Sequence, residues 1–296
     1  HGATSQAVVT ITVTGTNDGP VAQTGTNAAT EDGAVINGTL SETDADTNDT
    51  HTYALITNTS EGSATVQANG DYSFDPGADF QDLALGETRD VTFTYEVTDN
   101  NGATSQAVVT ITVTGTNDGP VAQAGTNTAT EDGAVVNGTL SETDADTNDT
   151  HTYALISNTS EGSATVQANG DYSFDPGADF QDLALGETRD VTFTYEVTDN
   201  HGATSQAVVT ITVTGTNDGP VAQTGTNTAT EDGSVVNGTL SETDADTNDT
   251  HTYTLITNTS EGSATVQVNG DYSFDPGADF QDLALGETRD VTFTYE

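Results

Sequence analysis

The chain has 296 residues, of which 47 are acidic, three are arginine and none is lysine, so its formal net charge is −44. Nucleic-acid binding is excluded because it needs cationic side chains that displace counterions from phosphate, and binding to anionic membrane surfaces is disfavoured. Cysteine is absent, so the chain can hold neither a disulfide nor a thiolate metal site. So many oxygen ligands favour a hard cation as partner, above all Ca²⁺.

The sequence repeats itself every 100 residues. Of residues 1–100, 95 match residues 101–200, and 90 of residues 101–196 match residues 201–296. A period of this length indicates a linear array of whole domains. We expect residues 1–16 to be the last strand of a preceding repeat, followed by repeats at 17–116, 117–216 and 217–296, of which the third lacks its last strand.

Each repeat shows short segments with the alternation of half-buried β-strands. In chain order they lie near residues 121–123, 135–140, 151–156, 164–168, 171–175, 191–199 and 209–214. The last of these repeats the pattern of residues 109–114. No segment is as long and apolar as a transmembrane helix, so no membrane insertion is predicted. About seven short strands in 100 residues predict an all-β fold, with tandem immunoglobulin-like or cadherin-like β-sandwich domains in a linear array.

Two hairpins are readable within the repeat. Asn169 and Gly170 join the strands at 164–168 and 171–175 and place Tyr172 and Phe174 on the inward face. A second turn covers residues 99–102, between the two strands with the most regular alternation. The connector Gly-Thr-Asn-Asp-Gly-Pro recurs at 15–20, 115–120 and 215–220, and its proline makes it short and stiff.

Acidic residues concentrate near the connectors. Asp144 and Asp146, with copies at 44, 46, 244 and 246, point to one side of an extended segment, so both can reach one ion. An Asp-x-Asp pair alone is equally typical of a polar loop. Asn117 and Asp118 of the connector, with Asp199 of the turn, add oxygen donors that a sandwich gathers at its ends. These groups predict Ca²⁺ sites that clamp neighbouring repeats and offset carboxylate repulsion.

Three motifs carry a family resemblance. Thr-Gly-Thr-Asn-Asp-Gly-Pro-Val-Ala (114–122), Asn-Gly-Asp-Tyr-Ser-Phe-Asp-Pro (169–176) and Leu-Gly-Glu-Thr-x-x-x-x-Phe-Thr-Tyr-Glu-Val-Thr-Asp (185–199) resemble VCBS-type repeats. These are cadherin-like or immunoglobulin-like modules in the extender regions of bacterial RTX adhesins. The resemblance implies secretion to the bacterial cell surface, calcium between domains, and a spacer that projects terminal binding domains, with neighbouring repeats as partners.

A more distant resemblance to animal cadherins assigns roles to individual residues. It implies a linker pair at Asn117 and Asp118, a glutamate early in the domain at Glu131, and Glu187 one position from a cadherin glutamate. Since Gly115 and Gly119 replace further cadherin ligands, we expect one or two ions per junction. The full set of expected ligands is Asn17, Asp18, Glu31, Asp44, Asp46, Glu87, Asp99, Asn117, Asp118, Glu131, Asp144, Asp146, Glu187, Asp199, Asn217, Asp218, Glu231, Asp244, Asp246 and Glu287.

Other functions are weighed against this one. The chain shows no nucleophile–base–acid set or phosphate loop, so an enzyme is not expected. A Ca²⁺-dependent module for carbohydrate, or a homophilic adhesion domain, is the alternative function. His51, His151 and His251 follow acidic residues and could join a transition-metal site, although a histidine at a strand edge is the better interpretation. The head of one molecule could also complete the third repeat of another, by head-to-tail strand complementation.

Overall fold

The computed structural model describes residues 1–296, and all its regular secondary structure is β-strand. The chain divides into two compact units. Unit 1 comprises His1–Ala122, Glu142–Thr152 and Val197–Ser205, and unit 2 comprises Gln123–Ser141, Tyr153–Glu196 and Gln206–Glu296. The chain has no helical segment with the length and apolar character that crossing a bilayer requires. The predicted all-β class is therefore confirmed.

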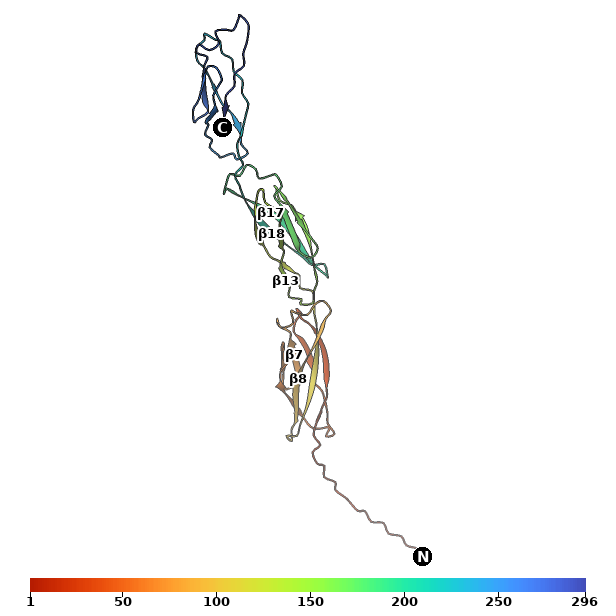
Figure 1. Cartoon of the computed structure of the whole chain (residues 1–296). Helices are drawn as coiled ribbons and strands as arrows, with labels where there is room; N and C mark the ends of the chain where they lie inside the picture. The colour runs from red at the N-terminus through yellow and green to blue at the C-terminus, as the bar shows by residue number, and fades with distance from the viewer. The chain divides into compact units, whose positions relative to one another are not determined.

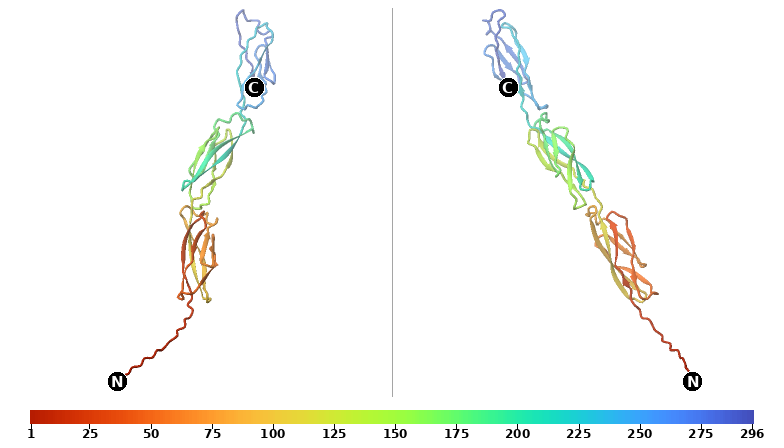
Figure 2. Two further views of the ribbon diagram at one scale, coloured as in Figure 1. Left: turned by 180° about the vertical axis from the view of Figure 1, so that it is seen from behind. Right: turned by 90° about the vertical axis from the view of Figure 1, so that its right-hand side faces the viewer.

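The first repeat is a sandwich of a four-stranded and a three-stranded sheet, of orders β2-β9-β8-β5 and β3-β7-β6, with a short pair β1-β4. Its strands β7 and β8 are labelled in Figure 1, and Figure 2 shows the repeat from two further directions. The strands are β1 (Val21–Ala22), β2 (Gly25–Thr30), β3 (Ile36–Thr39), β4 (Glu42–Thr43), β5 (His51–Thr57), β6 (Ser63–Val66), β7 (Asp71–Asp75), β8 (Thr88–Asp99) and β9 (Thr104–Thr114).

The long hairpin β8–β9 organises the larger sheet. Its antiparallel register runs from Thr88↔Thr114 to Thr98↔Thr104, and the predicted turn at 99–102 joins the two strands. On its other side β9 pairs with β2 in parallel, Gly25 opposite Val109. Alternate residues of β8 are buried, as their sequence pattern predicts.

Aromatic side chains join the two sheets. Tyr72 of β7 packs on Phe93 of β8 with ring centroids 5.2 Å apart, and both are buried. The hydroxyl of the fully buried Tyr95 donates to the carbonyl oxygens of Gln23 and Ser41, at 2.7 and 2.8 Å. It thereby fixes the residues that follow the connector and those that precede the acidic loop.

The second repeat has sheets of order β11-β18-β17-β14 and β12-β16-β15, and a pair β10-β13. The predicted hairpin at Asn169-Gly170 is confirmed: Gly170 has φ +89°, a conformation that favours glycine, and Tyr172 and Phe174 are buried. The strands are β10 (Val121–Ala122), β11 (Gly125–Thr130), β12 (Val136–Thr139), β13 (Glu142–Thr143), β14 (His151–Ser157), β15 (Ser163–Val166), β16 (Asp171–Asp175), β17 (Thr188–Asp199) and β18 (Thr204–Thr214).

The third repeat has a sheet of order β20-β24-β23 and pairs β19-β21 and β22-β25. It has no counterpart of β9 or β18, and residues 225–230, the counterpart of β2 and β11, form no strand. Ala229 is accordingly exposed, whereas Ala29 and Ala129 are buried. The strands are β19 (Val221–Ala222), β20 (Val236–Thr239), β21 (Glu242–Thr243), β22 (Leu255–Thr257), β23 (Ser263–Val266), β24 (Asp271–Asp275) and β25 (Thr294–Tyr295).

Residues 1–16 belong to no sheet of this chain. Val9, Ile11 and Val13 are exposed here, whereas their counterparts Val109, Ile111 and Val113 are buried in β9. Strand exchange between molecules stays a prediction.

We predict that Phe93→Ala lowers the free energy of unfolding of the first repeat by about 3–5 kcal/mol, because a fully buried ring leaves a cavity. Hydrogen exchange of the β8 and β9 amides measures this change. Leu85→Ala is the control: its side chain is exposed, so the change should stay within about 0.5 kcal/mol. Equal effects of the two substitutions would contradict the assigned core.

Candidate metal centres

Three carboxylates from successive parts of the chain converge beside the connector between the first and second repeats. Glu31 follows β2, Asp118 lies in the connector, and Asp146 lies in the loop after β13. One oxygen from each lies within 4.8 Å of the others. We call Glu31, Asp118 and Asp146 the connector cluster; all three belong to unit 1.

Hydrogen bonds hold one side of this cluster. The Thr116 amide and hydroxyl donate to Glu31 Oε1, at 2.6 and 2.9 Å. The Asp118 amide donates to Asp146 Oδ2 at 2.9 Å. The remaining oxygens, Glu31 Oε2, Asp118 Oδ2 and Asp146 Oδ1, are buried and accept no hydrogen bond. Buried acceptors without a partner are costly, so the cluster has the form of a cation site.

The pKa values of two members reflect this burial. Burial, and to a smaller extent neighbouring carboxylates such as Asp149, raise the pKa of Asp146 to about 6. Burial, and then Asp32 and Asp144, also raise the pKa of Asp118. A raised carboxyl pKa means that ionising the group costs the folded state free energy. The folded chain keeps its full stability below the ordinary pKa and loses part of it as pH rises through the raised pKa. A bound cation would offset this cost of ionisation at neutral pH.

The arrangement is repeated in unit 2. Glu131, Asp218 and Asp246 likewise place one oxygen each within 4.8 Å of the others. The Asp218 amide donates to Asp246 Oδ2 at 2.9 Å. Glu131 Oε2, Asp218 Oδ2 and Asp246 Oδ1 are again buried without a hydrogen-bond partner. The copy shows that the cluster is a property of the repeat and its connector.

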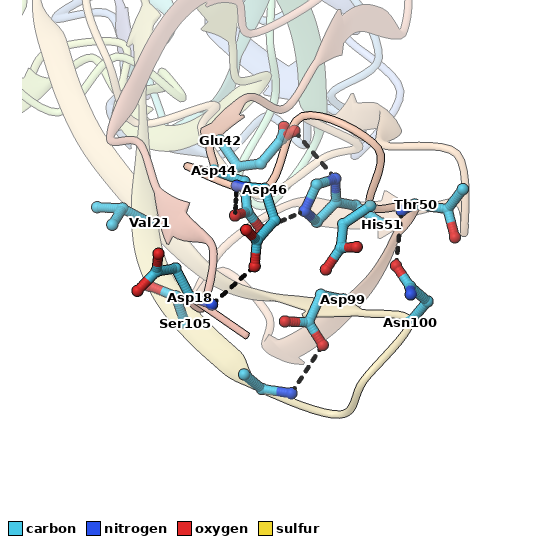
Figure 3. Close-up of polar contacts among 12 residues, drawn as sticks. Asp18, Val21, Glu42, Asp44, Asp46, Thr50, His51, Asp99, Asn100 and Ser105 are labelled. Carbon is cyan, nitrogen blue, oxygen red and sulfur yellow. Dashed lines mark hydrogen bonds and ion pairs between the residues drawn. The ribbon is translucent and has the colours of Figure 1, made fainter. Parts of the chain in front are cut away.

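A second acidic cluster lies at the β8–β9 turn. Asp44, Asp49 and Asp99 place one oxygen each within 4.8 Å of one another. Figure 3 shows Asp44, Asp46 and Asp99 around the same space, with Asp18 and His51 beside them. We call Asp44, Asp49 and Asp99 the hairpin cluster. Its copy in the second repeat is Asp144, Asp149 and Asp199. The connector asparagines reach both copies, because Asn17 Nδ2 donates to Asp99 and Asn117 Nδ2 to Asp199, each at 2.9 Å.

The expected Asp-x-Asp pair is therefore divided. Asp146 joins the connector cluster, whereas Asp144 joins the hairpin cluster. The Asp146 amide donates to Asp144 Oδ1 at 3.1 Å, so the backbone between them turns and separates the two side chains. The loop after β13 thus contributes to two neighbouring acidic clusters.

The histidine before the next strand pairs with acidic residues. His51 Nε2 lies 2.9 Å from Asp44 Oδ2, and its Nδ1 lies 3.2 Å from Glu42 Oε1. The hydrogen bond to Asp44 raises the pKa of His51, and the same bond lowers the pKa of Asp44. The structure thus places this histidine at the start of β5, in contact with one member of the hairpin cluster.

Other expected ligands lie outside both clusters. Asn148 Nδ2 donates to Glu87 at 2.8 and 3.0 Å, and Asn248 donates to Glu187 at 2.9 Å. Glu287 accepts from the Ala284 amide at 3.0 Å. Glu231 has a buried Oε2 without a hydrogen-bond partner. The Asn148–Glu87 bond links consecutive repeats directly, a contact that sequence analysis did not anticipate.

Asp49 and Asp149 are the cluster members that sequence analysis did not select as ligands. Asp49, the third aspartate of the same loop, does not follow the alternate spacing of Asp44 and Asp46. A turn explains its placement, since the Asp49 amide donates to the Asp46 carbonyl oxygen at 3.0 Å. An acidic residue three positions after an Asp-x-Asp pair is the sequence signal for this ligand, because such a turn brings its side chain back toward the first aspartate.

The donor sets fit calcium. Ca²⁺ takes oxygen ligands at about 2.3–2.6 Å, so two oxygens on opposite sides of one ion lie about 4.8 Å apart. One oxygen from each cluster member falls within that limit. Carboxylates, with the connector asparagines beside the hairpin clusters, supply ligand types that this ion prefers.

Comparison with known proteins agrees with the fold. The profile of the bacterial cadherin-like domain matches residues 17–115 and 117–215. The chain belongs to this family. The third repeat, residues 217–296, matches the bacterial Ig domain. No curated protein matches the chain. Tandem cadherin-like domains suggest an extracellular adhesion or spacer role.

Solved structures of animal cadherins share the fold of this chain. Human CDH23 EC21-23 is 16% identical, with 93% of this chain and 99% of that chain covered and a TM-score of 0.60. Mouse cadherin-23 EC22-24 is 19% identical, with 88% and 89% covered and a TM-score of 0.59. At these identities the likeness shows the fold alone.

We predict that the Asp146 carboxyl group of the metal-free chain titrates near pH 6, and that Ca²⁺ lowers its midpoint because the ion binds the deprotonated form. Carboxyl ¹³C NMR measures both midpoints, and Asp146→Asn assigns the signal. A midpoint near the ordinary value without metal, or one that calcium leaves unchanged, would contradict the site.

Proposed function

We propose that the chain is a calcium-stiffened spacer from the extender region of a bacterial surface adhesin of the VCBS and RTX type. Its repeats, at 17–116, 117–216 and 217–296, would hold terminal binding domains away from the cell. Ca²⁺ bound at the connector clusters would fix each repeat against the next. Reach then grows with the number of copies, as near-identical repeats in single file suggest.

The observation that carries the proposal is the set of buried, unpartnered carboxylate oxygens in the connector cluster. Glu31, Asp118 and Asp146 come from one repeat, the connector and the following repeat, and each has an oxygen without a hydrogen bond. Three carboxylates at this separation repel one another unless a cation lies between them. An ion bound by all three would restrain the connector, because its ligands belong to both repeats.

The metal would act on the connector and on folding together. A ligand that binds only the ordered arrangement stabilises it by mass action, and calcium would also offset part of the net charge of −44. At the first proposed site the ligands are the residues of the connector cluster. At the second they are the residues of the hairpin cluster with the connector asparagine.

The alternative, a binding module for carbohydrate or for a second adhesion molecule, has less support. Carbohydrate sites commonly present aromatic side chains, yet no Phe or Tyr of this chain is exposed. A homophilic adhesion array would need a distinctive repeat, and the copies are nearly identical. A spacer needs neither feature.

We predict that calcium at about a hundred times its Kd raises the free energy of unfolding by about 2.7 kcal/mol per occupied site. We also predict that it increases the maximum dimension of the chain in small-angle X-ray scattering. Asp146→Asn should abolish most of the effect at one connector, because it removes a ligand charge while preserving side-chain size.

The matched control is Asp90→Asn, which removes the same charge from an exposed position of β8 outside both clusters. This variant should respond to calcium as the unmodified chain does. A metal-free chain that is already as extended and as stable as the calcium-bound one would overturn the proposed function.

A further inference from the structure

The two copies of the hairpin cluster differ at one neighbouring residue. The turn after β8 carries Asn101 in the first repeat, whereas the turn after β17 carries His201 in the second. The acidic residues themselves are the same in both copies. The difference therefore changes the chemistry at the edge of an otherwise repeated site.

In the first repeat the amide group of Asn101 satisfies the neighbouring acceptors. Its Nδ2 donates to Asp49 Oδ2 at 3.1 Å and makes a short hydrogen bond to Asn17 Oδ1. Asn17 in turn donates to Asp99. The asparagine thus provides the hydrogen bonds that the acidic side chain and the connector amide need.

In the second repeat the corresponding acceptors have no such partner. Both carboxylate oxygens of Asp149, and Asn117 Oδ1, are buried and accept no hydrogen bond. The Asp149 side chain is only 1% exposed. A buried carboxylate without hydrogen bonds is among the most costly arrangements in a protein interior, so this position has the form of a cation site.

His201 stands at the open side of that position. Its Nε2 lies 3.5 Å from Asp149 Oδ1, and its side chain is 26% exposed. This separation exceeds the usual 2.7–3.2 Å of a hydrogen bond. It is close to the roughly 3.4 Å between two ligand atoms on a tetrahedral ion with bonds of about 2.1 Å. The oxygens of Asp144 and Asp199 lie within 4.8 Å of that of Asp149.

We propose that His201 Nε2, with Asp144, Asp149 and Asp199, makes the second-repeat hairpin cluster a site for a divalent transition-metal ion such as Zn²⁺. An imidazole nitrogen is a ligand that Zn²⁺ favours and that Ca²⁺, with its preference for oxygen, does not. The first repeat keeps an amide at this place and lacks that selectivity. The inference deepens the proposed function, on which it rests, by naming a second metal at one of its sites.

Calorimetric titration of the full metal-free chain with Zn²⁺ tests the proposal. The unmodified chain should show one zinc site that His201→Asn weakens at least about tenfold, because the substitution removes a ligand. The reverse change, Asn101→His, should add a second site of similar affinity in the first repeat. Each substitution introduces the residue that the other repeat carries in the same turn, so both variants should keep the unmodified circular dichroism spectrum.

The comparison isolates His201 from the other histidines, since His1, His51, His151 and His251 are present in every variant. NMR should show the zinc-induced shift at the His201 ring. Zinc binding that His201→Asn leaves unchanged in affinity and stoichiometry, or an Asn101→His chain without an added site, would overturn the inference.

Calcium titration of the same variants separates this inference from the proposed function. Calcium affinity should change less than about twofold in His201→Asn, because the imidazole is not a calcium ligand. A chain that stiffens with calcium but shows no zinc difference retains the spacer function and loses the transition-metal site. A chain that shows the zinc difference but does not stiffen with calcium retains the transition-metal site and loses the spacer function.

Discussion

Carboxylate oxygens that are buried, close together and without hydrogen bonds impose the main physical constraint on this protein. In the connector cluster, the fold directs one such oxygen from Glu31, Asp118 and Asp146 into a common space. Backbone and hydroxyl donors occupy only the other side of the group. Because the chain has just three arginines and no lysine, an external cation is the simplest source of the missing positive charge.

A repeat with modest apolar content forms a defined sandwich because its apolar and acidic side chains gather in different places. Aromatic residues such as Phe93 and Tyr95 fill the centre of the first repeat, whereas the acidic loops collect beside the connector and the β8–β9 turn. Arg89 lies in neither cluster and forms ion pairs with Asp82 and Glu61. The protein thus separates an apolar core, which holds each sandwich together, from acidic clusters suited to a metal.

Sequence patterns predicted the parts of the fold that depend on alternation and turn chemistry. The alternation in 91–97 predicted β8, and Asn169-Gly170 predicted a hairpin. Residues 125–130 gave no such signal, because their Gly, Thr, Asn and Ala content is typical of a loop; they form β11 through parallel pairing with β18. The acidic pattern and the gathering of connections at the ends of a sandwich predicted Asp118 and Asp146 beside the connector, and the cadherin resemblance predicted the role of Glu31. Asp149 depended on a turn that forms only in the folded loop.

Crystallographic location of calcium tests the central claim most directly. Crystals of the chain grown with calcium and measured near the calcium absorption edge should show an anomalous peak in each connector cluster. In the first of these, the peak should lie about 2.3–2.6 Å from Glu31 Oε2, Asp118 Oδ2 and Asp146 Oδ1. Density for ordered water instead of a cation, at calcium concentrations that stabilise the chain, would contradict the account.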